Sequence, residues 1–479
     1  MRRRMRPKRR TRQIDRGRRD GPRPTHRYRR KPKDGRRDGP TDGQDNEPTM
    51  KDYASDKDFV RRFRDGALEI ARRKMDDVAR EQAKIETAVP LGPRMATGGH
   101  FGGFFLWDTA FAVSWGRYAP GDWPLASMLD NFYAVAEPDG FIGREFTPRG
   151  TPVWSPFSPI AFAPPILAWA ECLLAGAGRA PAGRAAAAYP KLKRHHEVCR
   201  ARFRRPDGLY FSDGFGCGMD DIPRHPRGLT PAQAAAVPGG IRCTAECLNP
   251  ESRERIWSWL SKMADHLSWN RQAGWIDLSC QMALDALHLA EIADGLGLAA
   301  DAAAWRAEHA EIAAAVNALC WDEALGFYCD AWEGGTIRRK TAAGFWALLS
   351  RVATPERAAR VVAALKDPAQ FDRPCGFPAV SADDPEDYEP ETAYWRGVVW
   401  PPTEYAALLG LLAWGERDFA EAAARRYYNA NAALWEKTGT VFENNSPEQC
   451  ERPKERSGPD FCGWGAIAPV ALPVEFGWI

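Results

Sequence analysis

Apolar residues recur at helical spacing through most of this 479-residue chain. Between residues 278 and 297, one apolar face is formed at offsets of 4, 7, 11 and 14 by Met282, Ala286, Leu289, Ala293 and Leu296. Glycines at 295 and 297 end this pattern, and an apolar face resumes at Trp305 and runs to Leu319. Two helices joined by so short a link predict an antiparallel helix hairpin.

The same alternation predicts an all-α chain. Further helices are expected over residues 51–89 and 106–118, in a segment opened by the prolines at 164 and 165, over 183–203, 252–268, 341–351, 355–366, 402–414 and 416–436, and from 464 onward. Long loops rich in Gly, Pro, Trp and acidic residues separate successive hairpins, whereas the links within hairpins are short. Hairpins of this kind pack around one centre as a closed double ring, an (α/α)6 toroid, with the long loops on one face. An open α-solenoid is the alternative, but the loops differ from one another and no fixed-period repeat occurs, which favours the closed ring.

Charge divides the chain into two parts. Residues 1–40 contain 19 Lys and Arg against 4 Asp, so their net charge is +15, and the remainder carries −12. Residues 1–49 have almost no aliphatic side chains and predict a disordered Arg-rich extension before a single folded domain, the (α/α)6 toroid, at 50–479. A nonspecific nucleic-acid contact by this extension and a start codon misassigned ahead of Met50 both stay open. The chain stops at Ile479 within a predicted packed helix, which leaves open an incomplete C-terminus.

Several classes of protein are disfavoured by composition. No apolar run reaches the length of a membrane span, and no apolar segment of a signal peptide follows the arginines. Eleven scattered cysteines, an odd number, favour reduced thiols and a cytoplasmic setting. Cys243 and Cys247 lack a matching second pair, and His100, His195 and His196 show no ligand spacing, so we expect neither a metal nor a cofactor.

The long loops carry carboxylates beside aromatic residues. Asp220 and Asp221 follow Gly216 and Gly218, and Pro223 ends the segment. The same face is expected to carry Asp108, Glu145, Glu391, Glu404, Glu443 and Glu448, interleaved with Trp107, Tyr394, Trp395, Arg396, Trp400 and Trp464. Indole rings stack on sugar faces, and glycosidic bond cleavage needs two carboxyl groups, roughly 6.5–9.5 Å apart where a water must fit between base and sugar. This combination favours a carbohydrate site.

Four ordered motifs carry a family resemblance. They are residues 105–111 (FLWDTAF), 218–224 (GMDDIPR), 394–400 (YWRGVVW) and Phe442-Glu443 followed by residues 461–464 (FCGW). In these motifs the chain resembles glycoside hydrolase family 63, which includes processing α-glucosidases and mannosylglycerate hydrolases and is related to the family 37 trehalases. The resemblance implies an (α/α)6 barrel that hydrolyses an α-linked glucoside or mannoside with inversion, acting on a small-molecule or oligosaccharide substrate.

The resemblance also implies roles for individual residues. Asp220 would be the general acid and Glu443 the general base. The sugar would be held by Trp107, Asp108, Tyr394, Trp395, Arg396, Trp400 and Trp464. Three alternatives stay open: Glu448 as the base, Asp108 as a helix cap, and Arg396 as a structural clamp.

Other functions also stay open. They are a trehalase-like or glycogen-debranching-like hydrolase, a non-catalytic carbohydrate-binding toroid, and a basic-armed scaffold.

Overall fold

The computed structural model describes residues 51–479, apart from residues 96, 99–101, 213–215, 230–232, 234–239, 243, 264–267, 271–272, 392–393 and 454–456. The extension predicted to be disordered, residues 1–49, lies outside the described residues. No helix in the part of the chain that the structure describes is long and apolar enough to cross a membrane.

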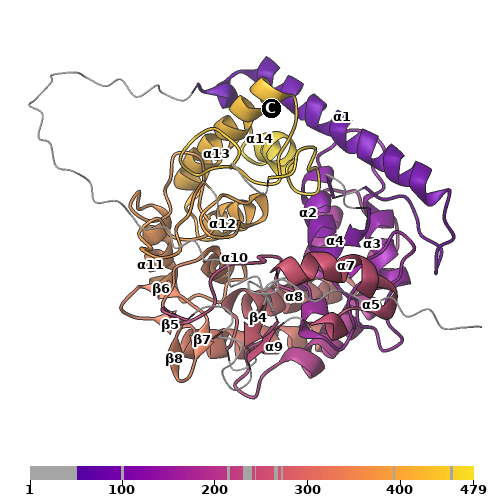
Figure 1. Ribbon diagram of the computed structural model, residues 1–479, viewed down its shortest axis with the longest axis horizontal. Helices are drawn as coiled ribbons and strands as arrows, with labels where there is room; N and C mark the ends of the chain where they lie inside the picture. The colour runs from indigo at the N-terminus through magenta and orange to yellow at the C-terminus, as the bar shows by residue number, and fades with distance from the viewer. Residues whose placement is uncertain are drawn as a thin grey trace, which may run out of the picture. The chain divides into compact units, whose positions relative to one another are not determined.

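Helices of two kinds alternate along the chain (Figure 1). The outer helices are α1 (Lys57–Gln82), α3 (Leu125–Ala134), α5 (Arg184–Phe203), α9 (Ala299–Leu319), α11 (Pro355–Leu365) and α13 (Arg417–Thr438). The inner helices are α2 (Leu106–Gly116), α4 (Leu167–Gly176), α8 (Ile276–Gly295), α10 (Trp346–Leu349), α12 (Pro401–Ala413) and a final π-helical turn η5 (Ile467–Ala471) that continues into α14 (Leu472–Glu475).

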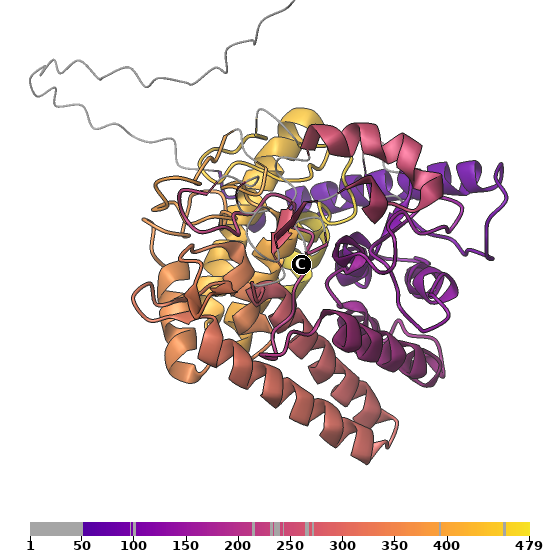
Figure 2. The ribbon, with the colours of Figure 1, turned by 60° about the horizontal axis from the view of Figure 1, so that its bottom comes forward.

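Contacts between the inner helices close the ring. In chain order α2 packs on α4, α4 on α8, α8 on α10, α10 on α12, α12 on η5, and η5 returns to α2. The outer helices α1, α3, α5, α9 and α13 pack on inner helices from outside the ring, as Figure 2 shows for α9 beside α8, and α11 packs on residues 327–328. A solenoid would leave its first and last inner helices apart, so the predicted (α/α)6 toroid is confirmed.

Burial explains which helices lie inside. Every residue of α2 is buried, and so are most residues of α12, because a helix that is apolar on all sides needs neighbours on all sides. In contrast, α1 buries one face that includes Phe59, Phe63 and Leu68 and leaves its charges in solvent. The side chain of Asp56 fixes the start of α1 by accepting hydrogen bonds from the backbone N–H groups of residues 58 and 59.

The two ends of the ring have different connections. Links from an inner to the next outer helix are short, for example residues 296–298 between α8 and α9 and residues 414–416 between α12 and α13. Links from an outer to an inner helix are long and include residues 204–275, 366–400 and 439–466. The long loops therefore gather where the inner helices begin, as the sequence predicts.

Local order within the loops comes from short elements. Four antiparallel pairs join β1 (Phe104–Phe105) to β2 (Glu145–Phe146), β3 (Gly240–Arg242) to β4 (Ser268–Asn270), β5 (Trp321–Asp322) to β6 (Phe327–Tyr328), and β7 (Ala331–Trp332) to β8 (Gly335–Thr336). The loops also hold α7 (Pro250–Met263), η2 (Pro159–Ala161), η3 (Ala245–Cys247) and η4 (Ala342–Phe345), while η1 (Tyr53–Ser55) precedes α1.

Differences from the predicted elements are local. Helix α3 was not predicted, because ten residues hold too few periods and its apolar face is completed only by packing on α2 and α4. The helix predicted over 51–89 ends at Gln82, and the one predicted over 252–268 ends at Met263, ahead of β4. Helix boundaries depend on tertiary contacts that periodicity does not report.

Candidate active site

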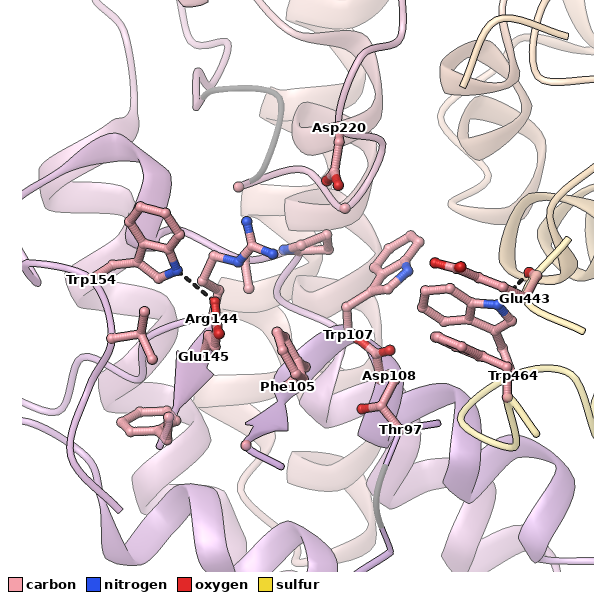
Figure 3. Close-up of a pocket in the computed structure, with 18 of the residues that line it drawn as sticks. Thr97, Phe105, Trp107, Asp108, Arg144, Glu145, Trp154, Asp220, Glu443 and Trp464 are labelled. Atoms are coloured by element: carbon pink, nitrogen blue, oxygen red, sulfur yellow. Dashed lines mark hydrogen bonds between the residues drawn. The ribbon is translucent and has the colours of Figure 1, made fainter. Parts of the chain in front are cut away.

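A cavity of about 350 Å³ opens among the long loops (Figure 3). Its walls include five tryptophans, which are Trp107, Trp154, Trp395, Trp400 and Trp464. Four acidic side chains also line it, which are Asp108, Glu145, Asp220 and Glu443. Because these residues come from five different loops or helix starts, only the closed ring brings them together.

Glu443 is held by its loop in a buried position. Its Oε2 accepts a hydrogen bond from the backbone N–H of Gly458 at 3.2 Å, and its Oε1 accepts one from the Tyr394 hydroxyl at 3.3 Å. The indole N–H of Trp464 donates to its backbone carbonyl at 2.7 Å, which fixes the main chain. Burial raises the pKa of Glu443 to about 7, although these two hydrogen bonds to the carboxylate act in the opposite direction.

Asp220 lies on a tight loop that two glycines make possible. Gly218 has a φ of +79°, and a Cβ there would lie 3.1 Å from the Trp107 ring. A Cβ on Gly216 would lie 2.8 Å from a backbone carbonyl oxygen. The half-buried carboxyl of Asp220 reaches the cavity from one side of Trp107, and Glu443 lies on the other side (Figure 3).

A buried cation anchors the end of the Asp220 loop. Arg224 pairs with Asp277 at 2.5 Å and with Asp330 at 2.8 Å, and its guanidinium lies 4.1 Å from the centre of the Trp275 ring. Asp330 also accepts the backbone N–H of residue 276, the first residue of α8. This network attaches the Asp220 loop to the start of an inner helix.

Asp221 joins the Asp220 loop to the aromatic loop. Its Oδ1 accepts a hydrogen bond from the backbone N–H of Trp395 at 2.7 Å. The Trp395 and Trp400 rings stack 4.0 Å apart, and the indole N–H of Trp400 donates to the carbonyl of Tyr394. Asp221 therefore sets the position of a wall rather than facing the substrate space.

The aromatic motif does not place all its members in the cavity. Tyr394, Trp395 and Trp400 line it, but Arg396 is absent from the lining and lies 3.3 Å from Asp387 and 4.0 Å from Asp221. This placement favours the clamp interpretation of Arg396 over sugar binding.

Asp108 stands in the first turn of α2 and is buried. Burial raises its pKa to about 8; the guanidinium of Arg144 opposes this rise, whereas the carboxylate of Glu443 adds to it. The residue before α2 makes no side-chain cap, and Asp108 lines the cavity. A carboxyl that stays protonated near neutral pH can donate a hydrogen bond to a ligand oxygen.

Glu448, the alternative base, is engaged elsewhere. Arg373 donates to both of its carboxylate oxygens, at 2.8 and 2.7 Å, and the Tyr388 hydroxyl donates to one of them. These partners lower the pKa of Glu448 although its partial burial acts to raise it, and Glu448 does not line the cavity. A carboxylate saturated by an arginine is a poor proton acceptor.

Sequence reasoning missed part of one wall. Trp154 donates to Glu145 at 2.8 Å, and the Arg144 guanidinium lies 5.8 Å from the centre of the Trp154 ring (Figure 3). The pairing of β1 with β2 and a hydrogen bond from the residue 153 N–H to the residue 145 carbonyl position this wall. The sequence feature that could have indicated this wall is the Gly, Pro and aromatic content of residues 135–166, but this segment carries no recognisable motif.

Comparisons with solved structures agree with this fold. The family 63 mannosylglycerate hydrolase of Thermus thermophilus, in complex with glucose, is 20% identical with a TM-score of 0.61, covering 85% of this chain and 99% of that one. Neutral trehalase Nth1 of Saccharomyces cerevisiae is 14% identical with a TM-score of 0.52, covering 83% and 79%.

Comparisons with curated sequences are shorter. A mannosylglycerate hydrolase of Rubrobacter radiotolerans is 32% identical over 136 residues, 28% of this chain and 30% of that protein. An uncharacterized protein of Borreliella burgdorferi is 22% identical over 305 residues, 63% of this chain and 54% of that protein. The chain thus spans about half or less of the curated relatives it matches. The family model described as the mannosylglycerate hydrolase MGH1-like glycoside hydrolase domain, however, matches residues 106–461, so the chain belongs to that family.

Proposed function

We propose that this protein is an inverting glycoside hydrolase that acts on an α-linked glucoside or mannoside. One observation carries the proposal: Asp220 and a desolvated Glu443 line the same tryptophan-walled cavity. Burial raises the pKa of Tyr394 well above its ordinary value, and the carboxylates of Glu443, Asp220 and Asp221 raise it further. Family membership supports the same reaction class.

In the proposed reaction Asp220 donates its proton to the glycosidic oxygen as the bond to the anomeric carbon breaks. Glu443 removes a proton from a water that attacks that carbon from the opposite face, so the configuration inverts. A base with a pKa of about 7 is well matched to neutral pH. Activity is therefore expected to rise as pH increases through about 7, because only ionised Glu443 accepts the proton.

The remaining cavity residues are proposed to hold the sugar. Trp107, Trp395, Trp400 and Trp464 offer apolar faces, and neutral Asp108 offers a hydrogen-bond donor. The name of the Rubrobacter relative supports testing a mannosylglycerate first, and the likeness to a trehalase supports including trehalose.

We further propose a cytoplasmic enzyme whose catalytic domain is residues 50–479, with residues 1–49 outside it. Ten of the cysteines, all those in the described part of the chain, form no disulfide, which suits a reducing compartment. Deleting residues 1–49 should leave the rate of hydrolysis unchanged; a large loss would place the extension in the catalytic machinery.

The test is a substrate screen with product anomers followed by NMR. Mannosylglycerate, glucosylglycerate, trehalose and simple α-glucosides and α-mannosides are compared for the wild type, Asp220→Asn and Glu443→Ala. The wild type should release the β-anomer first, and azide should restore turnover in Glu443→Ala by supplying a nucleophile that needs no base. Release of the α-anomer, or full activity of either variant, would refute the assignment.

A further inference from the structure

Away from the cavity, three side chains with metal-binding atoms converge between two inner helices. Cys172 lies on α4, and His288 and Glu291 lie three residues apart on one face of α8. One ligand atom from each lies within 4.8 Å of the other two. None of the three lines the active-site cavity.

The distances suit a small tetrahedral ion. The imidazole Nδ1 of His288 and a carboxylate oxygen of Glu291 are 3.2 Å apart. Zinc bound at 2.0–2.3 Å by nitrogen, oxygen and sulfur holds neighbouring ligand atoms roughly 3.3–3.7 Å apart. The cluster therefore needs to tighten by only about 1 Å, and the largely exposed side chain of Glu291 is free to move that far.

The charge around the thiol is of the sign that attracts a cation. Burial raises the pKa of Cys172 well above its ordinary value, and the carboxylates of Glu291, Glu171 and Asp285 raise it further. The thiol itself points at the backbone carbonyl of His288 at 3.8 Å, so it already faces the α8 segment that carries the other two ligands.

We propose that Cys172, His288 and Glu291 form a zinc-binding site that links α4 to α8, with water as the fourth ligand. Thiolate, imidazole and carboxylate are the ligands that zinc takes in proteins. The site is structural, since α4 and α8 are neighbours in the inner ring and the proposed chemistry needs no metal there. It stands independently of the proposed hydrolase function.

The experiment titrates tag-free, reduced, chelator-treated full-length protein with Zn²⁺, against a chromogenic chelator of known affinity. Cobalt binding is followed in parallel through its thiolate charge-transfer absorption. One ion per chain is expected, with a thermal midpoint that rises with free zinc. Cys172→Ser and His288→Gln should each weaken binding by on the order of 100-fold and remove the thermal shift.

Cys450→Ser is the matched control, because it removes the other half-buried thiol and should leave zinc binding unchanged. Should Cys172→Ser bind zinc as the wild type does, or should the wild type bind none, the site is refuted. If the Cys172 variant fails to fold, His288→Gln is the test. Loss of the cobalt–thiolate band in a folded His288→Gln supports the site, and an unchanged band refutes it. Hydrolase activity serves as a fold control and should be the same with and without zinc.

Discussion

Replacing the proposed base by its amide should remove activity and stabilise the fold. In Glu443→Gln the side-chain oxygen can still accept from the Gly458 N–H, and the amide can donate to the Tyr394 hydroxyl. The geometry of the loop is therefore kept while the proton acceptor is lost. General base catalysis typically contributes about 10²–10⁴-fold, so kcat should fall by that factor.

The effect on stability follows from the raised pKa. The native state holds a proton at Glu443 up to pH 7 or so, whereas the unfolded chain releases it near the ordinary value of 4.5. The free energy of unfolding therefore falls as pH rises from 4.5 through about 7, and the loss is complete above that. At 1.36 kcal/mol per pKa unit, the ionised carboxylate costs the native state about 3 kcal/mol.

Urea unfolding at low and high pH measures this difference. Glu443→Gln should match the wild type near pH 4 and exceed it by up to about 3 kcal/mol near pH 8.5. Glu448→Gln is the matched control on the same loop, because the pKa of Glu448 is lowered and its ionised form stabilises the fold. That variant should keep its activity and lose stability near pH 8.5, opposite in sign to Glu443→Gln.

Two results would contradict the reasoning. If Glu443→Gln keeps activity within about tenfold of the wild type, Glu443 is not the base. If its stability near pH 8.5 equals that of the wild type, the carboxylate is solvated in the native state and the cavity wall is not the desolvating surface described above.

Three further outcomes test the framework of the site. Arg224→Met should lower the free energy of unfolding by about 3–5 kcal/mol in urea, because it leaves buried Asp277 unpaired. Gly218→Ala should cost about 1–2 kcal/mol and reduce kcat/KM, because its φ is positive and the methyl meets Trp107; wild-type kinetics would contradict this. The pKa of His196 is raised to about 9, because hydrogen bonds to buried carboxylates outweigh the effect of its desolvation. The wild type should therefore lose stability relative to His196→Gln as pH rises from 6.5 to about 9, which thermal unfolding measures. If the difference in stability between the two proteins does not change with pH, His196 is not protonated in the core.

The ring could be predicted because its causes are local. Apolar periodicity, glycine stops and short links are each visible within about twenty residues, and composition distinguishes the inner helices from the outer ones. Helix α2 is apolar on all sides, whereas α1 is apolar on one. The helix predicted over 341–351 is present as η4 followed by α10, and periodicity could not show that its first residues form a 3-10 helix.

The site could be predicted only where its residues share a motif with their neighbours. Asp220 and Glu443 stand in recognisable motifs, and the structure brings both to one cavity. Trp154 depends on a contact with Glu145 across a loop, which no local pattern encodes. Arg396 shares a motif with cavity residues, but its side chain is drawn away by a carboxylate on another part of the same loop.

The raised pKa values of Asp108 and Glu443 bear on the charge of the cavity near neutral pH. Burial raises the pKa of both Asp108 and Glu443, and the negative charge of Glu443 raises the pKa of Asp108 further. Once Glu443 is ionised, its negative charge makes the Asp108 carboxyl hold its proton more tightly. Near neutral pH the dominant ionised form therefore has a charged acceptor at 443 and a neutral donor at 108. An inverting reaction needs a charged Glu443 and a neutral Asp108 if Glu443 activates the water while Asp108 donates a hydrogen bond to a sugar oxygen.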